Sequence, residues 1–266
     1  MKDGFKNMFR NGSYLYNLFS YLYHIKKNYW LPPKYDSLHN LIAVYANIRK
    51  NIYFLQVGAN DGVSNDPLNE FISSFNWGGI CVEPLPENFK KLRETYDGKS
   101  EVILVNAAVG NGDDQKIYFV NPQKAKALNI EIPDWFNQLA SFDKKLVVSD
   151  LKGDRKDEIV DELDIKSISF ATLIKEYNVT KVDLLHIDTE GADWMILSSF
   201  PFELFLPDVI IFEHNHLEES DYKTANDLLR KKGYRLIRVG TDTFCYTKKL
   251  KAAYEKIMKE TYFIAK

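Results

Sequence analysis

Short apolar runs alternate with amphipathic stretches along most of the chain. The runs are rich in strand-forming residues and lie at residues 52–55, 79–82, 102–105, 116–120, 167–170, 182–187, 208–212, 234–239 and 243–247. Between most of them, apolar residues recur at helical spacing, as they do from Asp221 to Lys232. Repeated strand–helix units predict an α/β fold. We expect a mostly parallel seven-stranded sheet with helices on both faces and an antiparallel C-terminal strand.

Residues 1–50 precede this alternation and form a predicted N-terminal helical extension, whereas residues 51–266 form the main domain. Pro32 and Pro33 interrupt the extension, because consecutive prolines cannot continue a helix. Before this break, aromatic and aliphatic residues at helical spacing are mixed with lysine and arginine. We favour a helix that packs on the domain or on a second subunit of a homo-oligomer. Contact with a membrane surface is the alternative.

One stretch of the main domain, about residues 121–157, lacks clear periodicity and is predicted to be an insert. It carries Trp135, Phe136 and Phe142 among polar residues. Long irregular segments inside a compact domain are usually functional or disordered. We favour a lid or a wall of the substrate site, where the aromatic rings either stack on a sugar or pack in the protein interior.

Composition excludes several classes of protein. Lysine and arginine total 35 against 37 acidic residues, so there is no basic surplus for binding nucleic acid. No run reaches the ~18 apolar residues of a membrane span. Polar residues interrupt each apolar run of the N-terminus, so this segment does not resemble a secretory signal. Cys81 and Cys245 both lie in strand-like runs and are expected to be buried thiols. The expected location is therefore the reducing cytoplasm.

The candidate ligand site begins at the stretch from Ile52 to Gly62, in which a predicted strand runs into a glycine turn. A turn of this kind brings backbone N–H groups up to a ligand. Glu83 follows the next strand and is placed to accept both hydroxyls of a ribose. A dinucleotide would need glycine where Asn60 stands, because the backbone must approach the pyrophosphate closely. S-adenosylmethionine has no pyrophosphate and suits this turn better.

Four motifs occur in the order and spacing of the FkbM family of S-adenosylmethionine-dependent O-methyltransferases, which this chain resembles. They are Gln56-Val57-Gly58-Ala59-Asn60-Asp61-Gly62, Val82-Glu83-Pro84, Asn106-Ala107-Ala108-Val109-Gly110 and Leu185-His186-Ile187-Asp188-Thr189-Glu190-Gly191. The resemblance covers about residues 52–247 and implies a Rossmann-like methyltransferase fold. It also implies the cofactor-binding residues Gln56, Gly58, Asn60, Asp61, Gly62, Glu83, Ala107, Ala108, Asp188 and Glu190. The family usually has lysine in place of His186, which we predict to be structural.

Methyl transfer to a hydroxyl needs a group that activates the acceptor, since a protonated hydroxyl is a poor nucleophile. The candidate catalytic residues at predicted strand ends are Asp188, Glu213, His214 and His216. The two histidines are two residues apart in a predicted extended segment, so they are expected to face the same side and to supply a base. Asp188 and Glu213 could instead hold Mg²⁺. The sequence leaves both routes open.

The leading hypothesis is an O-methyltransferase that acts on a small-molecule or carbohydrate hydroxyl. A metal-dependent sugar transferase that uses Asp188 and Glu190 as an acid pair is the second hypothesis. A non-catalytic module that only binds the cofactor is the third. Asp193 opens a predicted helix, where a carboxylate is stabilised by the helix dipole, and it is as readily structural as catalytic.

Overall fold

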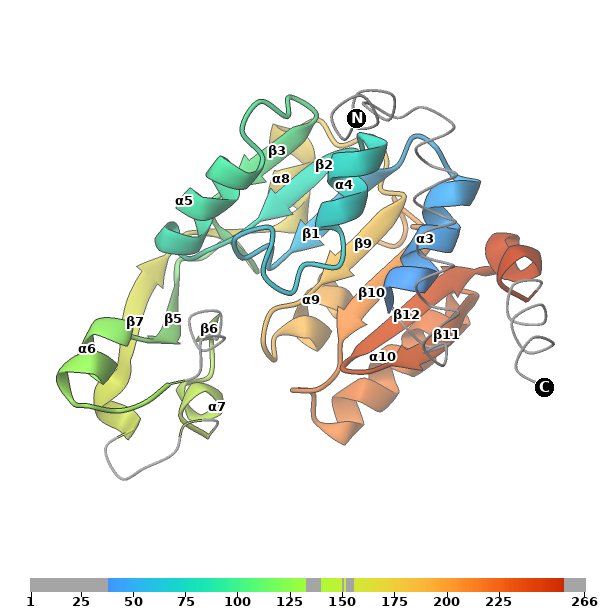
Figure 1. Cartoon of the computed structure of the whole chain (residues 1–266). Coiled ribbons are helices and arrows are strands. Elements are labelled where there is room, and N and C mark those ends of the chain that lie inside the picture. Colours follow the sequence, from blue (N-terminus) through green and yellow to red (C-terminus); the bar gives the residue numbers. More distant parts are fainter. Residues whose placement is uncertain (1–37, 133–139, 150, 152–155, 256–266) are drawn as a thin grey trace, which may run out of the picture.

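The computed structural model describes residues 38–132, 140–149, 151 and 156–255 (Figure 1). Its centre is a seven-stranded sheet with the order β11-β12-β10-β9-β1-β2-β3, in which only β12 runs antiparallel to its neighbours. The strands are β1 (Tyr53–Val57), β2 (Gly78–Val82), β3 (Val102–Val105), β9 (Leu184–Ile187), β10 (Val209–Glu213), β11 (Tyr234–Val239) and β12 (Asp242–Thr247). The predicted mostly parallel sheet with an antiparallel C-terminal strand is confirmed.

Helices cover both faces of this sheet, as predicted. One face carries α3 (Leu38–Ile48), α4 (Asn69–Phe75) and α5 (Pro86–Thr95), and the other carries α8 (Phe170–Glu176), α9 (Asp193–Ser199) and α10 (Glu219–Lys231). The central strands β9 and β10 are buried along their whole length, which explains why they read as continuous apolar runs.

The strand order fixes the position of the ligand site. From β1 the chain adds β2 and β3 on one side, and later adds β9 and β10 on the other. The order therefore reverses between β1 and β9, whose carboxyl ends are neighbours through the pairing of Val57 with Ile187. In open α/β sheets, ligands bind in the crevice at this reversal.

A second, three-stranded sheet of order β6-β5-β7 lies beside the main sheet (Figure 1). It consists of β5 (Gln115–Val120), β6 (Ala140–Ser141) and β7 (Val160–Ile165), with α6 (Pro122–Ala127), α7 (Lys144–Ser149) and a 3-10 helix (Lys156–Ile159). The short pair β4 (Ala108–Val109) and β8 (Ser167–Ile168) leads into and out of this lobe. The predicted insert falls within it. Of the three aromatic residues singled out there, Trp135 and Phe136 lie outside the described residues.

Helix α3 lies within the predicted N-terminal extension, and it buries Leu41, Ile42 and Tyr45 against the domain. The Tyr45 hydroxyl donates a hydrogen bond to the backbone oxygen of Asp183, 3.1 Å away at the start of β9. The predicted membrane or subunit contact concerns residues 1–37, outside the described part. Within that part, no helix is long and apolar enough to cross a membrane. Cys81 and Cys245 are both free and buried.

Candidate active site

A cavity of about 390 Å³ opens at the carboxyl ends of β1, β2 and β9, where the strand order reverses. Its size is that of a small-molecule site. The small lobe contributes part of the wall through Ile117, Ala140 and Phe142. The cavity is thus enclosed by strand ends below and by the lobe at its side.

Gly58 lines the cavity in the turn after β1, against the backbone of Asp188, which follows β9. Its φ of +81° is in the left-handed region, and its N–H donates to Val82 O at 3.0 Å. A Cβ at this position would lie 1.7 Å from the carbonyl oxygen of Asp188. Only glycine can therefore occupy this turn while Asp188 stays at the end of its strand.

Glu83 lies beside this turn at the end of β2, and it is held by the backbone. Its Oε2 accepts from the N–H of Asn60 and its Oε1 from the N–H of Leu85, each at 2.9 Å. The side chain is 4% exposed, and this burial raises the pKa of its carboxyl to about 7 even though the two N–H groups lower it. A carboxylate oxygen has two lone pairs, so each oxygen keeps one for a ligand hydroxyl.

Six acidic side chains line the cavity. They are Asp66, Glu83, Asp188, Glu190, Glu213 and Asp242, and no lysine or arginine accompanies them among the described lining residues. Burial raises the pKa of Glu213 to about 10, and the charge of Asp188 adds to the shift. Burial, followed by Asp193 and Glu190, likewise raises the pKa of Asp188 well above its usual value. The cavity therefore favours ligands that carry positive charge.

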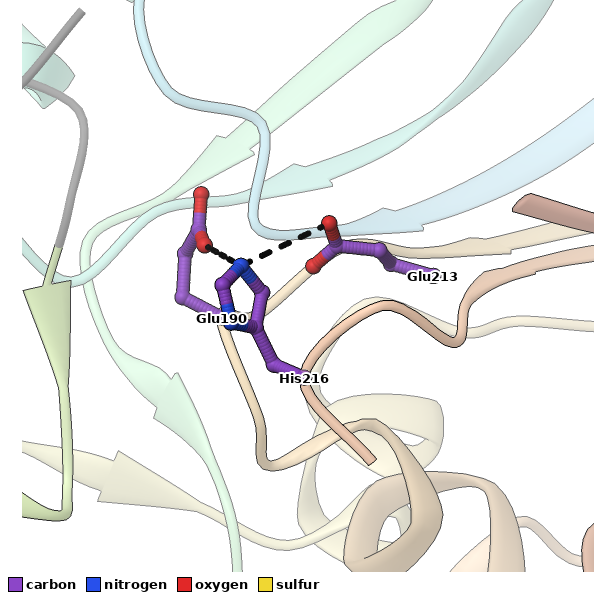
Figure 2. A group of neighbouring side chains, drawn as sticks. All are labelled: Glu190, Glu213 and His216. Carbon is purple, nitrogen blue, oxygen red and sulfur yellow. Dashed lines mark ion pairs between the residues drawn. The ribbon is translucent and has the colours of Figure 1, made fainter. Parts of the chain in front are cut away.

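His216 joins two of these carboxylates in a compact group, the Glu190–Glu213–His216 cluster (Figure 2). Its Nε2 lies 3.1 Å from Glu190 Oε2 and 3.8 Å from Glu213 Oε1. Glu190 reaches this position from a turn in which its own φ is +53°. Glu213 ends β10, and His216 follows it in the next turn.

His214 does not face this cluster. Its Nε2 accepts from Arg238 Nε at 2.6 Å, its Nδ1 lies 3.1 Å from Thr243 Oγ1, and its ring stacks on Tyr222. The expectation that both histidines face the same side is wrong, because the chain is not extended after Glu213. It turns there, and the N–H of Leu217 donates to His214 O at 3.3 Å.

A family model described as the methyltransferase FkbM domain matches residues 56–236, which is more than half of the chain. The chain belongs to the FkbM methyltransferase family. The match spans the glycine turn, Glu83 and the Glu190–Glu213–His216 cluster, and it ends before the cavity-lining residues Thr241 and Asp242. Comparison with curated proteins gives no significant match.

Solved structures resemble this FkbM methyltransferase only distantly. A fibrillarin pre-rRNA processing protein of Methanococcus jannaschii is 13% identical, with 75% of this chain and 67% of that chain covered and a TM-score of 0.39. A precorrin-6y C5,15-methyltransferase of Geobacter metallireducens is 11% identical, with 77% and 83% covered and a TM-score of 0.38. An Aeropyrum pernix fibrillarin with natively bound S-adenosyl-L-methionine is 11% identical, with 74% and 64% covered and a TM-score of 0.36.

The cavity brings together eight of the ten predicted cofactor-binding residues: Gln56, Gly58, Asn60, Glu83, Ala107, Ala108, Asp188 and Glu190. The other two, Asp61 and Gly62, are not among its lining residues. The Asp61 carboxylate accepts from the N–H groups of Val63 and Ser64, at 2.9 and 2.7 Å, and so shapes the loop. Gly62 packs beneath α5, where a Cβ would lie 2.8 Å from Leu92 Cδ1.

Two buried residues of the FkbM motif region have different surroundings. His186 lines the cavity, and neither ring nitrogen has a hydrogen-bond partner among the described residues. Burial lowers its pKa to about 4, so the ring is neutral. Asp193 does not line the cavity. Its Oδ2 accepts from the Thr189 hydroxyl at 3.1 Å and from the Gly191 N–H at 3.3 Å, which ties the motif turn to the start of α9.

Sequence reasoning missed two acidic residues of the wall, Asp66 and Asp242. Burial raises the pKa of each carboxyl to about 6. Asp66 precedes Pro67, a pair that is typical of a helix start, whereas α4 begins three residues later. Asp242 begins the antiparallel strand β12. The start of an antiparallel strand meets the edge where parallel strands end, and this signal points to Asp242.

Proposed function

We propose that this FkbM methyltransferase transfers a methyl group from S-adenosylmethionine to a hydroxyl of a small-molecule or carbohydrate acceptor. The observation that carries the proposal is the division of the cavity. Gly58, Asn60 and Glu83 line it after β1 and β2, and Glu190 and Glu213 line it after β9 and at the end of β10. His216 does not itself line the cavity but contacts both of these glutamates. One side suits a nucleoside with an amino-acid tail, and the other suits a hydroxyl that must lose its proton.

The residues of the first side fit S-adenosylmethionine, which supplies an electrophilic methyl group and a positive charge when it is bound. Glu83 has one lone pair left on each oxygen for the ribose hydroxyls. Asp188 and Asp66 also line the cavity, and because their pKa values are raised there, a bound sulfonium and amino group would favour their charged forms. Ala107 and Ala108 are small residues beside Glu83 and leave room for the base of the nucleoside.

The second side orients and activates the acceptor. His216 lies 3.1 Å from Glu190 Oε2, and this carboxylate would stabilise the imidazolium that forms when the ring accepts a proton. General base catalysis contributes ~10²–10⁴-fold to a rate, and alignment of the reactants adds more. Leu146 of the small lobe lies 3.0 Å from where a Cβ on Gly191 would be, so the lobe packs against the turn that carries Glu190.

The charge of the cavity argues against the sugar-transferase hypothesis. A nucleotide sugar carries a diphosphate, and the described cavity wall offers it six carboxylates and no lysine or arginine. With no such side chain to contact it, the diphosphate would depend entirely on a bound cation for charge balance. Only a measurement of turnover distinguishes the hypothesis of a non-catalytic module from that of an enzyme, because both predict cofactor binding.

Calorimetric titration of the protein with S-adenosylmethionine tests the cofactor. We expect one equivalent to bind with a dissociation constant in the micromolar range. Absence of binding in that range would overturn the proposal. Incubation with labelled cofactor and fractionated cell extract, followed by mass spectrometry of the methylated product, then identifies the acceptor. A product methylated on nitrogen or carbon would contradict the assignment of a hydroxyl.

Cofactor affinity is expected to increase with pH from about 6 to 8. The pKa of Glu83 is raised to about 7, so its carboxyl is protonated below that pH. A protonated carboxyl is a poorer acceptor for two ribose hydroxyls than a carboxylate. In Glu83→Gln the affinity should be lower, and the part of the pH dependence centred near pH 7 should disappear. Calorimetry on both proteins measures it. The amino group of the ligand titrates equally in both, so the difference between the two profiles reports Glu83, and parallel profiles would refute the role.

A further inference from the structure

We propose that Glu190, Glu213 and His216 bind a divalent transition-metal cation such as Zn²⁺ or Mn²⁺ at the acceptor side of the cavity. The three side chains come from separate points of the chain: the turn after β9, the end of β10 and the turn that follows it (Figure 2). They point toward a common centre, and each offers one ligand atom to it.

The distances within the cluster fit a shared cation. All three ligand atoms lie within 4.8 Å of one another. Zinc binds imidazole nitrogen and carboxylate oxygen at about 2.0–2.2 Å, which places neighbouring ligand atoms about 3.0–3.5 Å apart in tetrahedral or octahedral geometry. Of the separations from His216 Nε2, the 3.1 Å to Glu190 lies within that range and the 3.8 Å to Glu213 lies slightly above it. Small side-chain rotations would close the longer one.

An independent observation points to a missing partner at the same place. Glu213 is 9% exposed, and its Oε2 is buried without a hydrogen-bond partner among the described residues. Buried carboxylate oxygens are normally paired, because loss of hydration is costly. A proton on His216 would balance only one of the two glutamates. A divalent cation balances both and leaves the imidazole neutral.

The donor set selects the kind of cation. Two carboxylates alone would suit Mg²⁺, which takes oxygen ligands and retains several waters. An imidazole nitrogen favours Zn²⁺, Fe²⁺ or another first-row transition metal. The cluster shares Glu213 with the Mg²⁺ pair predicted from the sequence, but it has Glu190 and His216 where that prediction placed Asp188. Three protein ligands also leave a position open for an oxygen of another molecule.

The open position gives the cation a role at the acceptor, and this role rests on the proposed function. A hydroxyl bound to a divalent cation is more acidic than a free one, as bound water is. Carbohydrate acceptors with two adjacent hydroxyls would chelate the cation and so be oriented by it. Cation binding itself does not depend on methyl transfer, and it is measured without it.

Metal titration of the full-length protein, first stripped with a chelator, tests the site. Zn²⁺ and Mg²⁺ are titrated separately by calorimetry, and Co²⁺ is followed by its visible absorption, which reports nitrogen and oxygen ligands directly. We expect one equivalent of Zn²⁺ and of Co²⁺ to bind with micromolar or tighter affinity, and Mg²⁺ at least tenfold more weakly. Binding of Mg²⁺ as tightly as Zn²⁺ would overturn the assignment to a transition metal.

Matched variants locate the cation. His216→Ala and Glu213→Gln should each weaken Zn²⁺ binding at least tenfold, whereas His214→Ala, which removes the same residue type outside the cluster, should leave it within about twofold. Thermal unfolding in chelator establishes that each variant is folded. Equal Zn²⁺ affinity in wild type and His216→Ala would overturn the proposal. Titration of the stripped protein with S-adenosylmethionine separates this failure from that of the proposed function, because the cofactor residues lie outside the cluster apart from Glu190.

Discussion

Gly58→Ala is expected to abolish cofactor binding and to lower the free energy of unfolding by about 3 kcal/mol or more. A left-handed conformation costs a non-glycine residue ~1–2 kcal/mol, and overpacking of a tight site costs ~1–3 kcal/mol. Both penalties apply, since φ is +81° and the added Cβ would lie 1.7 Å from the Asp188 carbonyl oxygen. That oxygen is backbone, so relief requires β1 and β9 to separate at the cavity. Urea unfolding and S-adenosylmethionine titration measure the two effects.

The control variant Gly98→Ala separates the cost of the left-handed backbone from the cost of the steric clash. Gly98 also has a left-handed φ, +74°, but nothing lies within 4 Å of its added Cβ. This control should lose only ~1–2 kcal/mol and should bind the cofactor as the wild type does. If Gly58→Ala and Gly98→Ala were equally stable and bound the cofactor equally well, the close approach of Gly58 to the Asp188 carbonyl oxygen would not be a determinant of the site.

The sheet was predictable because its strands carry a strong local signal. The sequences of β9 and β10 are almost entirely apolar, as is typical of strands at the centre of a sheet with both faces covered. All four residues of β9 and all five of β10 are buried in the structure. The order in which strands alternate with helices then left few topologies. The small lobe was not predictable in the same way. The β6 strand has two residues, and its pairing with β5 joins Ala140 to Phe119 across the insert. A strand of two residues is too short to produce a recognisable alternation of apolar and polar residues.

The candidate site was predictable where a backbone constraint fixed the residue, as at Gly58, and where a carboxylate followed a strong strand, as at Glu83 and Asp188. It was not predictable where a turn decided the direction of a side chain. His214 and His216 have the same residue type and nearly the same position, and one packs against Arg238 while the other meets Glu190. The turn after Glu213 depends on contacts made with β11, β12 and the motif loop, which are distant in sequence.

His216→Ala is expected to reduce turnover by about 10²-fold or more while leaving the affinity for S-adenosylmethionine unchanged. A general base is worth ~10²–10⁴-fold, and loss of a metal ligand removes the activated acceptor altogether, so both routes for this cluster predict a large loss. The side chain contacts Glu190 and Glu213 on the acceptor side and is not itself among the cavity's lining residues. Single-turnover rates at saturating cofactor, together with calorimetry, measure the two quantities.

His214→Ala is the matched comparison, because it removes an imidazole only two residues away. We expect this variant to lose stability, because Arg238 Nε and Thr243 Oγ1 each lose a hydrogen-bond partner and Tyr222 loses a stacked ring. Each lost hydrogen bond costs about 1 kcal/mol, so the unfolding midpoint should fall while turnover stays within about fivefold of wild type. A loss of turnover in His214→Ala as large as in His216→Ala would contradict the division between them. Full activity in His216→Ala would exclude the cluster from acceptor activation.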